Sequence, residues 1–360
     1  MTPPPLREVF ASRLLRDRLF PLSTNLLCFG TPPTQNEAMD ILILGGTGFL
    51  GRGLALAALN ADHTVTCLAR GSAPAPAGVK FIQADRDHPK ALASVTGRAW
   101  DAIVDLTSHP RHARDATSQL TASHRIFVST TSVYVSFEVP DQDEDAAVAA
   151  PLEADLMTTM DQYPAAKRRC ELTYLDVPDP VTVIRPGLIG GAGDESGRSG
   201  YYPWRFAHPT GPDVIVPDDS FPVALIDVED LAAWILRCAE QRITGVFNAA
   251  GTPHVLRDVV DASIDITSST ARPRVVDDAT LDECGINPWA GPASLPLWVP
   301  WEGWRYVNIV DSSRALAQGL NRRPLRDTLI AALRTEESRR TPRPAGLSDG
   351  EEICLRAALH

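Results

Sequence analysis

Three glycines at positions 45, 48 and 51 constrain this chain more than any other feature of its sequence. They lie in GGTGFLG, residues 45–51, directly after the apolar run 41–44. A short, continuous and β-rich apolar run predicts a strand that is buried on both faces. An apolar pattern with helical spacing follows over 49–58. The segment therefore predicts a strand, a glycine turn and a helix in direct succession.

Each glycine of this turn has its own physical task. One permits the tight turn, one lets the backbone approach a pyrophosphate, and one lets the helix pack closely on the strand. The N-terminus of the helix offers unpaired N–H groups and a partial positive charge to phosphate. An ordinary strand–turn–helix connection is the alternative, and the flanking strand and helix are the context that argues against it. The sequence thus predicts a dinucleotide site at Gly45, Thr47, Gly48, Phe49, Leu50 and Gly51.

Composition excludes several other classes of protein. The chain of 360 residues has a net charge of -11, which argues against nucleic acid as its main partner. No stretch approaches the ~20 consecutive apolar residues of a membrane helix. The six cysteines show no CxxC spacing, and the eight histidines show no metal-ligand spacing. We expect a protein of the reducing cytoplasm, with no metal site and no membrane or nucleic-acid partner.

Residues 1–38 differ from the rest of the chain. They contain PPP at 3–5, PP at 32–33 and a mixed Arg/Leu stretch over 6–19. This stretch lacks the long apolar core and the small-residue cleavage site of a secretory signal. Because Met39 directly precedes the first predicted strand, we expect the fold to begin there and 1–38 to be a flexible extension.

Strands and helices alternate from residue 40 onwards. Strands are predicted at 41–44, 64–69, 79–83, 101–106, 126–130 and 181–185, and helices at 49–58, 111–121 and 161–175. This alternation predicts an α/β fold with a doubly wound parallel sheet. Gly and Pro become frequent over 187–222 and 287–303, so a smaller C-terminal lobe is expected there, with helices at 228–241 and 325–336. The predicted organisation is a dinucleotide-binding domain over 39–186 with parts of 214–250 returning to the sheet, a substrate-binding lobe over 187–345 and a tail over 346–360.

A tyrosine and a lysine stand four residues apart in YPAAK, residues 163–167. At this spacing Tyr163 and Lys167 share one face of a helix. An ammonium near a phenol lowers the tyrosine pKa, which suits the tyrosine for general acid/base chemistry. A Ser or Thr hydroxyl from STTSVY, residues 129–134, can hold a substrate oxygen at the end of the fifth strand. A surface Tyr/Lys pair is the alternative, and the position of the pair one helix after this strand argues against it.

Together these motifs resemble the extended short-chain dehydrogenase/reductase family, the NAD-dependent epimerase/dehydratase group, whose cofactor domain is a Rossmann fold. The resemblance runs from about Asp40 to the helix near Leu325, and its specific parts are GGTGFLG, Ala84-Asp85, STTSVY, YPAAK and Arg185-Pro186-Gly187. It implies Tyr163 as the catalytic acid/base and Thr130 as the catalytic Ser/Thr. Lys167 would lower the tyrosine pKa and bind the nicotinamide ribose. Further implied cofactor contacts are Asp85 at the adenine, Leu106, and Pro186 and Leu188 near the nicotinamide.

The end of the second strand distinguishes the two nicotinamide cofactors. A carboxylate there usually holds the ribose 2′-OH of NAD, whereas an Arg accommodates the 2′-phosphate of NADP. Here the strand ends in Ala69-Arg70, and Arg can form a bidentate, charge-assisted contact with phosphate. The sequence therefore favours NADP(H) over NAD(H), with Arg70 at the phosphate. The alternative is that Arg70 is a solvated loop residue.

Two later motifs depart from the nucleotide-sugar members of this family. Leu188 replaces their Asn, Val223 replaces an Arg near the substrate pyrophosphate, and Asp227 replaces a His. Losing a cation at a diphosphate site removes a strong contact, so a nucleotide sugar is a less favoured substrate. The aromatic residues of the lobe either line a pocket or form the lobe core. Arg205 either contacts the substrate or is a structural ion-pair partner. The candidate substrate contacts are Thr131, Tyr201, Tyr202, Trp204 and Arg205, with Trp289, Trp298, Trp301 and Trp304 as further aromatic candidates.

We expect an NADP(H)-dependent oxidoreductase that transfers hydride between nicotinamide and a carbonyl or alcohol carbon of a small organic substrate, with Tyr163 as acid/base. An epimerase or dehydratase acting on a sugar or nucleotide sugar would use the same residues and is the enzymatic alternative. A non-catalytic dinucleotide-binding sensor or scaffold is the alternative from another class, and the intact Thr130, Tyr163 and Lys167 set argues against it. The resemblance also suggests a homodimer through the helices at 111–121 and 161–175.

Overall fold

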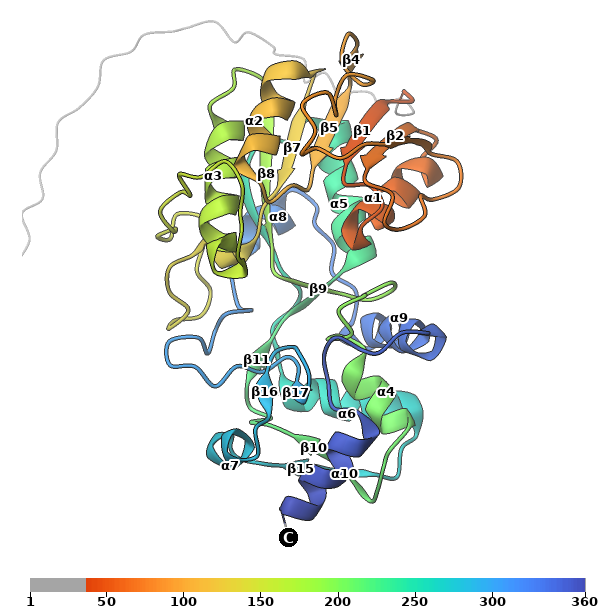
Figure 1. Cartoon of the computed structure of the whole chain (residues 1–360), viewed down its shortest axis with the longest axis vertical. Helices are drawn as coiled ribbons and strands as arrows, with labels where there is room; N and C mark the ends of the chain where they lie inside the picture. Colours follow the sequence, from red (N-terminus) through yellow and green to blue (C-terminus); the bar gives the residue numbers. More distant parts are fainter. Residues whose placement is uncertain (1–36, 360) are drawn as a thin grey trace, which may run out of the picture. The chain divides into compact units, whose positions relative to one another are not determined.

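The computed structural model describes residues 37–359, so the expected extension over 1–38 lies almost wholly outside the described residues. The main element is a seven-stranded sheet in the order β13-β8-β7-β5-β1-β2-β3, in which all neighbouring strands are parallel (Figure 1). The predicted α/β fold with a large parallel sheet is confirmed. The strands are β1 (Asp40–Leu44), β2 (Thr64–Ala69), β3 (Lys80–Gln83), β5 (Ala102–Asp105), β7 (Arg125–Val128), β8 (Val181–Pro186) and β13 (Gly245–Ala249).

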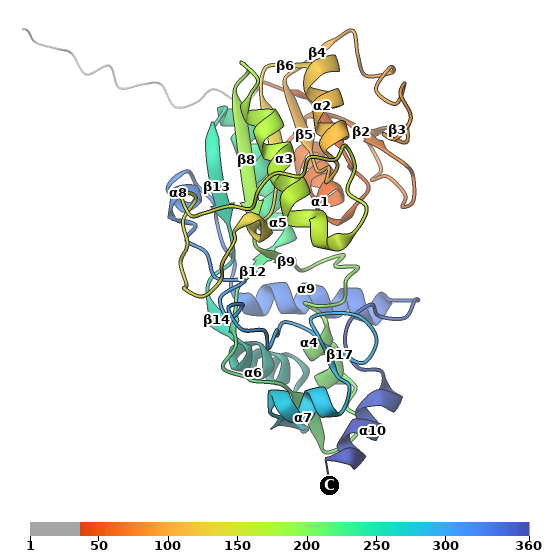
Figure 2. The ribbon, with the colours of Figure 1, turned by 60° about the vertical axis from the view of Figure 1, so that its left-hand side comes forward.

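The central strand β1 shows why this chain forms a two-sided sheet. Its residues Ile41 to Leu44 are each at most 1% exposed. Because side chains alternate along a strand, Ile41 and Ile43 enter one core while Leu42 and Leu44 enter another. Helices α1 (Phe49–Asn60) and α5 (Val228–Gln241) pack together in the first of these cores. Helices α2 (Pro110–Gln119) and α3 (Tyr163–Leu175) lie side by side against the sheet from the other side (Figure 2).

The sequence predicted a helix at 228–241 within the C-terminal lobe but also a return of parts of 214–250 to the sheet, and α5 lies with the sheet. Its buried residues Leu231 and Ile235 share a core with Leu54 of α1. The chain then continues directly into β13, which becomes an edge strand of the main sheet. The helical spacing of apolar residues revealed a buried face on 228–241, but periodicity alone does not say which element covers that face.

The C-terminal lobe has its own core, in which α4 (Tyr201–Ala207) packs on α6 (Leu256–Thr267) and α9 (Leu325–Ser338). A short parallel pair, β9 (Leu188–Gly190) and β12 (Leu225–Asp227), lies between the sheet and this lobe (Figure 1). The segment named as a tail contains α10 (Asp349–Ala358), whose Leu355 is buried in the lobe core. The remaining elements are β4 (Ala99–Trp100), β6 (Thr121–Ala122), β10 (Asp213–Val216), β11 (Pro222–Val223), β14 (His254–Val255), β15 (Arg272–Val275), α7 (Asp278–Glu283), β16 (Asn287–Pro288), β17 (Ser294–Leu295), α8 (Ser313–Ala317) and the 3-10 turns η1 (Thr131–Val133) and η2 (Met160–Gln162).

Within residues 37–359, no helix combines the length and the apolar character that crossing a membrane requires.

Candidate active site

The glycine turn between β1 and α1 has the geometry that its sequence predicts. Gly45 has a φ of +103°, in the left-handed region that favours glycine. A Cβ on Gly51 would lie 2.2 Å from the carbonyl oxygen of Gly45, so only glycine fits between helix and turn. Gly48 differs, because the nearest atom to its Cβ position is 3.7 Å away. The backbone at Gly48 is thus open to a ligand, while Gly45 and Gly51 shape the turn.

The different surroundings of Gly51 and Gly48 give a test of this assignment. We expect Gly51→Ala to lower the free energy of unfolding by about 1–3 kcal/mol, because the new methyl group overlaps backbone atoms. Gly48→Ala should change it by less than about 1 kcal/mol but weaken binding of a nicotinamide dinucleotide. Urea unfolding and calorimetric titration with NADP+ measure the two effects. Unchanged cofactor affinity in Gly48→Ala would contradict a close backbone approach of the pyrophosphate.

The N-terminus of α1 presents donors that the protein leaves available. Its N-cap is Gly48, no side chain caps the helix, and no acidic residue lies in the first turn. The first N–H groups of a helix have no intrahelical partner and carry a partial positive charge. This chemistry, together with the open approach at Gly48, fits the pyrophosphate of a dinucleotide.

One cavity of about 370 Å³ collects half of the predicted cofactor residues at the carboxyl ends of the strands. The side chain of Arg70 is exposed at this cavity, and its carbonyl oxygen accepts a hydrogen bond from Gln83. Its predicted members are Gly45, Thr47, Gly48, Arg70, Asp85 and Leu106.

Sequence reasoning missed a buried ion pair beside this cavity. Arg86 donates to both carboxylate oxygens of Asp105, at 2.7 and 3.0 Å. Asp105 is completely buried and also accepts from the hydroxyl of Tyr174 at 2.8 Å. The sequence contained an indication of this pair, because Asp105 is a charged residue at the end of an otherwise apolar strand. The pair fixes the Arg86 backbone, next to the proposed adenine contact Asp85.

A second cavity of about 640 Å³ contains the predicted catalytic residues. It adjoins the first, since Leu106 lines both. Lobe residues Arg198, Trp289 and Asn308 also line it. Its sequence-predicted members are Phe49, Leu50, Thr130, Thr131, Tyr163, Lys167, Pro186 and Leu188.

Lys167 is held rigidly inside this second cavity. Its Nζ donates to the carbonyl oxygens of Val128 at 2.6 Å and Thr107 at 2.8 Å. Val128 ends β7 and Thr107 lies just after β5, so the lysine links α3 to the carboxyl ends of these two strands. Burial lowers the pKa of Lys167 to about 8. The ammonium lies 6.0 Å from the centroid of the Tyr163 ring.

The pKa of Tyr163 differs from the expectation. Burial raises this pKa, and a hydrogen bond with Thr130 only partly opposes the rise. The lowering by Lys167 that the sequence suggested is not seen in this structure. The Thr130 hydroxyl also donates to Ser132 Oγ at 3.1 Å, which places three hydroxyl groups around one part of the cavity.

The predicted substrate contacts on α4 are mostly wrong. Tyr201, Tyr202 and Arg205 are 0% exposed and therefore cannot touch a ligand in this structure. Arg205 donates to Asp349 at 2.7 Å and to the carbonyl oxygen of Leu347 at 2.6 Å, so it is the structural ion-pair partner of the alternative interpretation. Trp204 is partly exposed and stacks against Arg343, 3.5 Å from the ring centroid to the guanidinium carbon.

Of the four tryptophans between residues 289 and 304, some belong to the lobe core and others line cavities. Trp298 is 2% exposed and belongs to the lobe core. Trp289 lines the catalytic cavity. Trp304 lines a neighbouring hollow that also includes Tyr163, and Trp301 packs edge-on against Trp304 on the exposed side. Two of the four tryptophans thus lie where a substrate could reach them.

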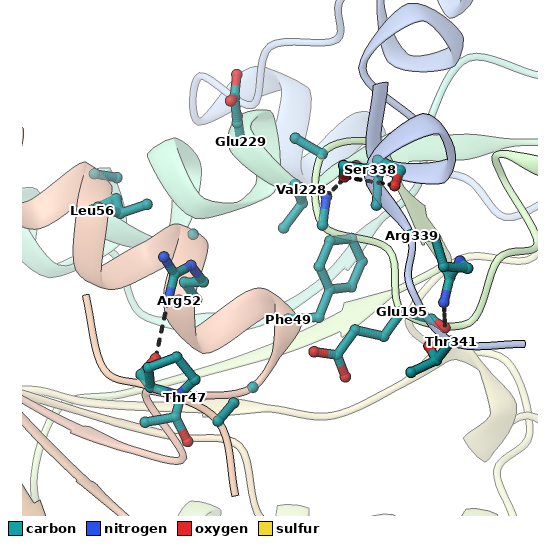
Figure 3. Close-up of a pocket in the computed structure, with 18 of the residues that line it drawn as sticks. Thr47, Phe49, Arg52, Leu56, Glu195, Val228, Glu229, Ser338, Arg339 and Thr341 are labelled. Atoms are coloured by element: carbon teal, nitrogen blue, oxygen red, sulfur yellow. Dashed lines mark hydrogen bonds between the residues drawn. The ribbon is translucent and has the colours of Figure 1, made fainter. Parts of the chain in front are cut away.

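A third hollow of about 880 Å³ borders the glycine turn and includes Thr47, Phe49 and Arg52 (Figure 3). Phe49 and Glu195 line both this hollow and the catalytic cavity. Arg52 points into it from α1 and donates to the carbonyl oxygen of Pro74 at 3.0 Å. On the opposite wall Arg339, at the end of α9, donates to the carbonyl oxygen of Glu195 at 3.2 Å.

Known proteins share sequence or fold with this chain. Residues 41–124 match the NAD dependent epimerase/dehydratase family. A 2′-dehydrokanamycin reductase of Streptomyces kanamyceticus is 26% identical over 233 residues, which cover 62% of this chain and 64% of that protein. The match therefore spans less than two thirds of that relative. The resemblance inferred from the sequence motifs is confirmed.

Solved structures share the fold at low sequence identity. A putative epimerase from Burkholderia cenocepacia J2315 superposes with a TM-score of 0.62 at 19% identity, covering 83% of this chain and 99% of that chain. The UDP-glucuronic acid 4-epimerase from Bacillus cereus, in complex with NAD, has a TM-score of 0.60 at 15% identity, with the same two coverages of 83% and 99%. At these identities the likeness shows the fold.

Proposed function

We propose that this chain is an NADP(H)-dependent oxidoreductase that transfers hydride between nicotinamide and a carbonyl or alcohol carbon of a small organic substrate. The observation that carries the proposal is the joint presence of Thr130, Tyr163 and Lys167 in one cavity that adjoins the glycine turn. The reductase activity in the name of the Streptomyces relative supports net reduction. The intact set of titratable groups argues against a sensor or scaffold, which has no use for an acid/base.

The chain's own residues would bind the substrate oxygen and move one proton. The bound nicotinamide supplies or accepts the hydride. The hydroxyl groups of Thr130 and Ser132 would hold the substrate oxygen, and the Tyr163 hydroxyl would donate its proton to that oxygen during reduction. Because burial raises the pKa of Tyr163, the phenol keeps its proton at neutral pH, as a donor requires. The fixed Lys167 ammonium would hold the nicotinamide ribose of the bound cofactor beside Tyr163.

Arg70 gives the test of the cofactor preference. We expect Arg70→Ala to weaken NADP+ binding by about 10- to 150-fold, because one charge-assisted contact with a phosphate contributes about 1.5–3 kcal/mol. NAD+ lacks this phosphate, so its affinity should stay the same. Parallel calorimetric titrations of both proteins with both cofactors measure the effect. A wild type that prefers NAD+, or an Arg70→Ala protein with unchanged NADP+ affinity, would overturn the assignment.

An epimerase or dehydratase remains the second candidate, since solved structures with this fold are epimerases. Two residues disfavour a nucleotide sugar as its substrate. Val223 replaces the pyrophosphate-binding Arg and is 1% exposed. Asp227 replaces the His and instead caps α5, accepting from the backbone N–H of Glu229 at 2.9 Å. Oxidised cofactor that stays bound through purification would favour this candidate over a net reductase.

The cytoplasmic location stays a prediction from cysteine usage. The homodimer through α2 and α3 stays a prediction from the family resemblance.

A further inference from the structure

Arg198 is a cation inside the catalytic cavity that the proposed chemistry does not use. Its guanidinium carbon lies 4.8 Å from the centroid of the Trp289 ring, and both residues line the cavity. Its Nε is buried and has no hydrogen-bond partner among residues 37–359. Burial lowers the pKa of Arg198, and the charge of Asp194 only partly opposes this effect. The guanidinium thus bears a desolvation cost that its surroundings do not fully offset.

Asn308 adds a second donor of the same kind from a different part of the chain. It is 4% exposed and lines the same cavity. Its Nδ2 also has no hydrogen-bond partner within the described residues. A buried donor without a partner costs about 1–3 kcal/mol. A ligand that accepts from both Arg198 and Asn308 would recover this free energy on binding.

The carboxylate of Asp194, four residues before Arg198, is already engaged. One oxygen of Asp194 accepts from Ser196 Oγ at 2.5 Å, and the other accepts from Ser199 Oγ at 2.7 Å. Arg339 donates to the carbonyl oxygen of Asp194 at 2.9 Å and to that of Glu195 at 3.2 Å, which ties the loop to the end of α9 (Figure 3). These contacts fix the backbone of the loop that carries Arg198.

The aromatic partner of Arg198 is held in a strained backbone conformation. Trp289 has a φ of +70°, in the left-handed region that bulky L residues rarely adopt. This conformation costs about 1–2 kcal/mol. Strained backbone conformations cluster at functional sites and ligand clamps. The Trp289 ring lines the cavity and lies beside the guanidinium of Arg198.

We propose that Arg198, Asn308 and Trp289 form a subsite for an oxyanion of the substrate, a carboxylate or a phosphate, in the cavity that holds Thr130 and Tyr163. The guanidinium fork matches either oxyanion in shape and in charge, and the buried Nε has no hydrogen-bond partner among residues 37–359. The Asn308 amide donates one further hydrogen bond, and Trp289 covers the flat face of the molecule that carries the anion. The inference rests on the proposed function, because it assigns the substrate class of that same site.

The test compares the binding of D-glucose, D-glucuronate and D-glucose 6-phosphate to the full chain saturated with NADP+. The three probes share one ring and differ only at C6, so calorimetric titration isolates the contribution of the anion. We expect at least one anion to bind tenfold or more tightly than glucose. The carboxylate and the phosphate are separate arms, and the arm with the higher affinity identifies the oxyanion.

Three variants connect this preference to Arg198. Arg198→Gln should abolish the higher affinity for the anionic probes. Arg198→Lys keeps the positive charge without the guanidinium fork and should retain part of that higher affinity. Arg326→Gln, which removes an exposed cation of α9 away from the cavity, should leave it intact. Thermal unfolding and NADP+ affinity show whether each variant is folded.

Two results would overturn the inference. One is equal affinity for the three probes, including no binding of any of them, and the other is an anion preference that persists in Arg198→Gln. Neither result requires turnover. A failure of the oxidoreductase proposal is recognised separately, by a wild-type protein that does not bind NADP+ or NAD+.

Discussion

Replacing Tyr163 by Phe is expected to lower kcat by about 10²- to 10⁴-fold, the usual contribution of a positioned general acid/base. The hydroxyl is the only group removed, and it lies in a hydrogen-bonded set with Thr130. The ring and the Lys167 contacts to Val128 and Thr107 remain, so the cofactor affinity should not change. Steady-state rates with NADPH and a carbonyl compound that the wild type reduces measure the first effect. Calorimetric titration with NADP+ measures the second.

A control variant tests whether the loss of activity is specific to the Tyr163 hydroxyl. Tyr306 is partly exposed and lies next to the cavity residue Val307 in sequence, so Tyr306→Phe should keep the wild-type rate. Full activity in Tyr163→Phe would refute the acid/base assignment. Loss of both activity and NADP+ binding in that variant would instead indicate that the tyrosine supports the cofactor site.

Glu171→Ala is expected to lower the free energy of unfolding by about 3–5 kcal/mol, the cost of removing one partner from a buried ion pair. Glu171 is 0% exposed and accepts from Arg185 at 2.8 and 2.9 Å. The variant leaves the Arg185 guanidinium buried beside Tyr134, without its carboxylate. Urea unfolding of both proteins at pH 7 measures the difference.

Glu153→Ala is the control for this prediction. Glu153 also pairs with an arginine, Arg169, but its side chain is 86% exposed. Exposed pairs contribute about 0–1 kcal/mol. Similar losses in the two variants would show that burial does not determine the strength of the Glu171 pair.

The Glu171 effect should also depend on pH. Burial alone raises the pKa of Glu171, but the hydrogen bonds and the charge of Arg185 outweigh it and hold the pKa below the ordinary value of 4.5. A lowered carboxyl pKa stabilises the folded state fully above the ordinary value. The contribution is lost as the pH falls through the lowered pKa. The difference in unfolding free energy between wild type and Glu171→Ala should therefore narrow as the pH falls below 4.5, and a constant difference would contradict this account.

The sequence predicted that Gly48, Arg70 and Asp85 lie together, because their positions depend on local patterns. The residues of β1, the glycine turn and α1 are contiguous, and the carboxyl ends of parallel strands meet at one edge of the sheet. Strand order along the chain therefore suffices to bring residues as distant as Gly48, Arg70 and Asp85 to one cavity. Whether these residues bind a cofactor stays a prediction.

The substrate contacts in the C-terminal lobe could not be predicted from local sequence patterns. Tyrosines such as Tyr201 and Tyr202 occur both in ligand pockets and in protein cores. Only the packing of α4 shows that these two belong to the core of the lobe. Arg198 and Asn308 were missed because neither belongs to a motif and they lie far apart in sequence. Their shared property, a buried donor without a partner, exists only after the chain has folded.

The interleaving of the lobe with the sheet limits how a protein of this kind can change its substrate. After β9 and α4 the chain returns through β12 and α5 to β13, and it then leaves again for α6. It returns once more at α8, which packs against β13, before it forms α9 and α10. No single stretch of the gene encodes the lobe alone, so one contiguous exchange of the lobe would also replace α5 and β13 of the main sheet. We expect the substrate specificity of related proteins to diverge by substitutions in separate loops, at positions such as 198, 289 and 308.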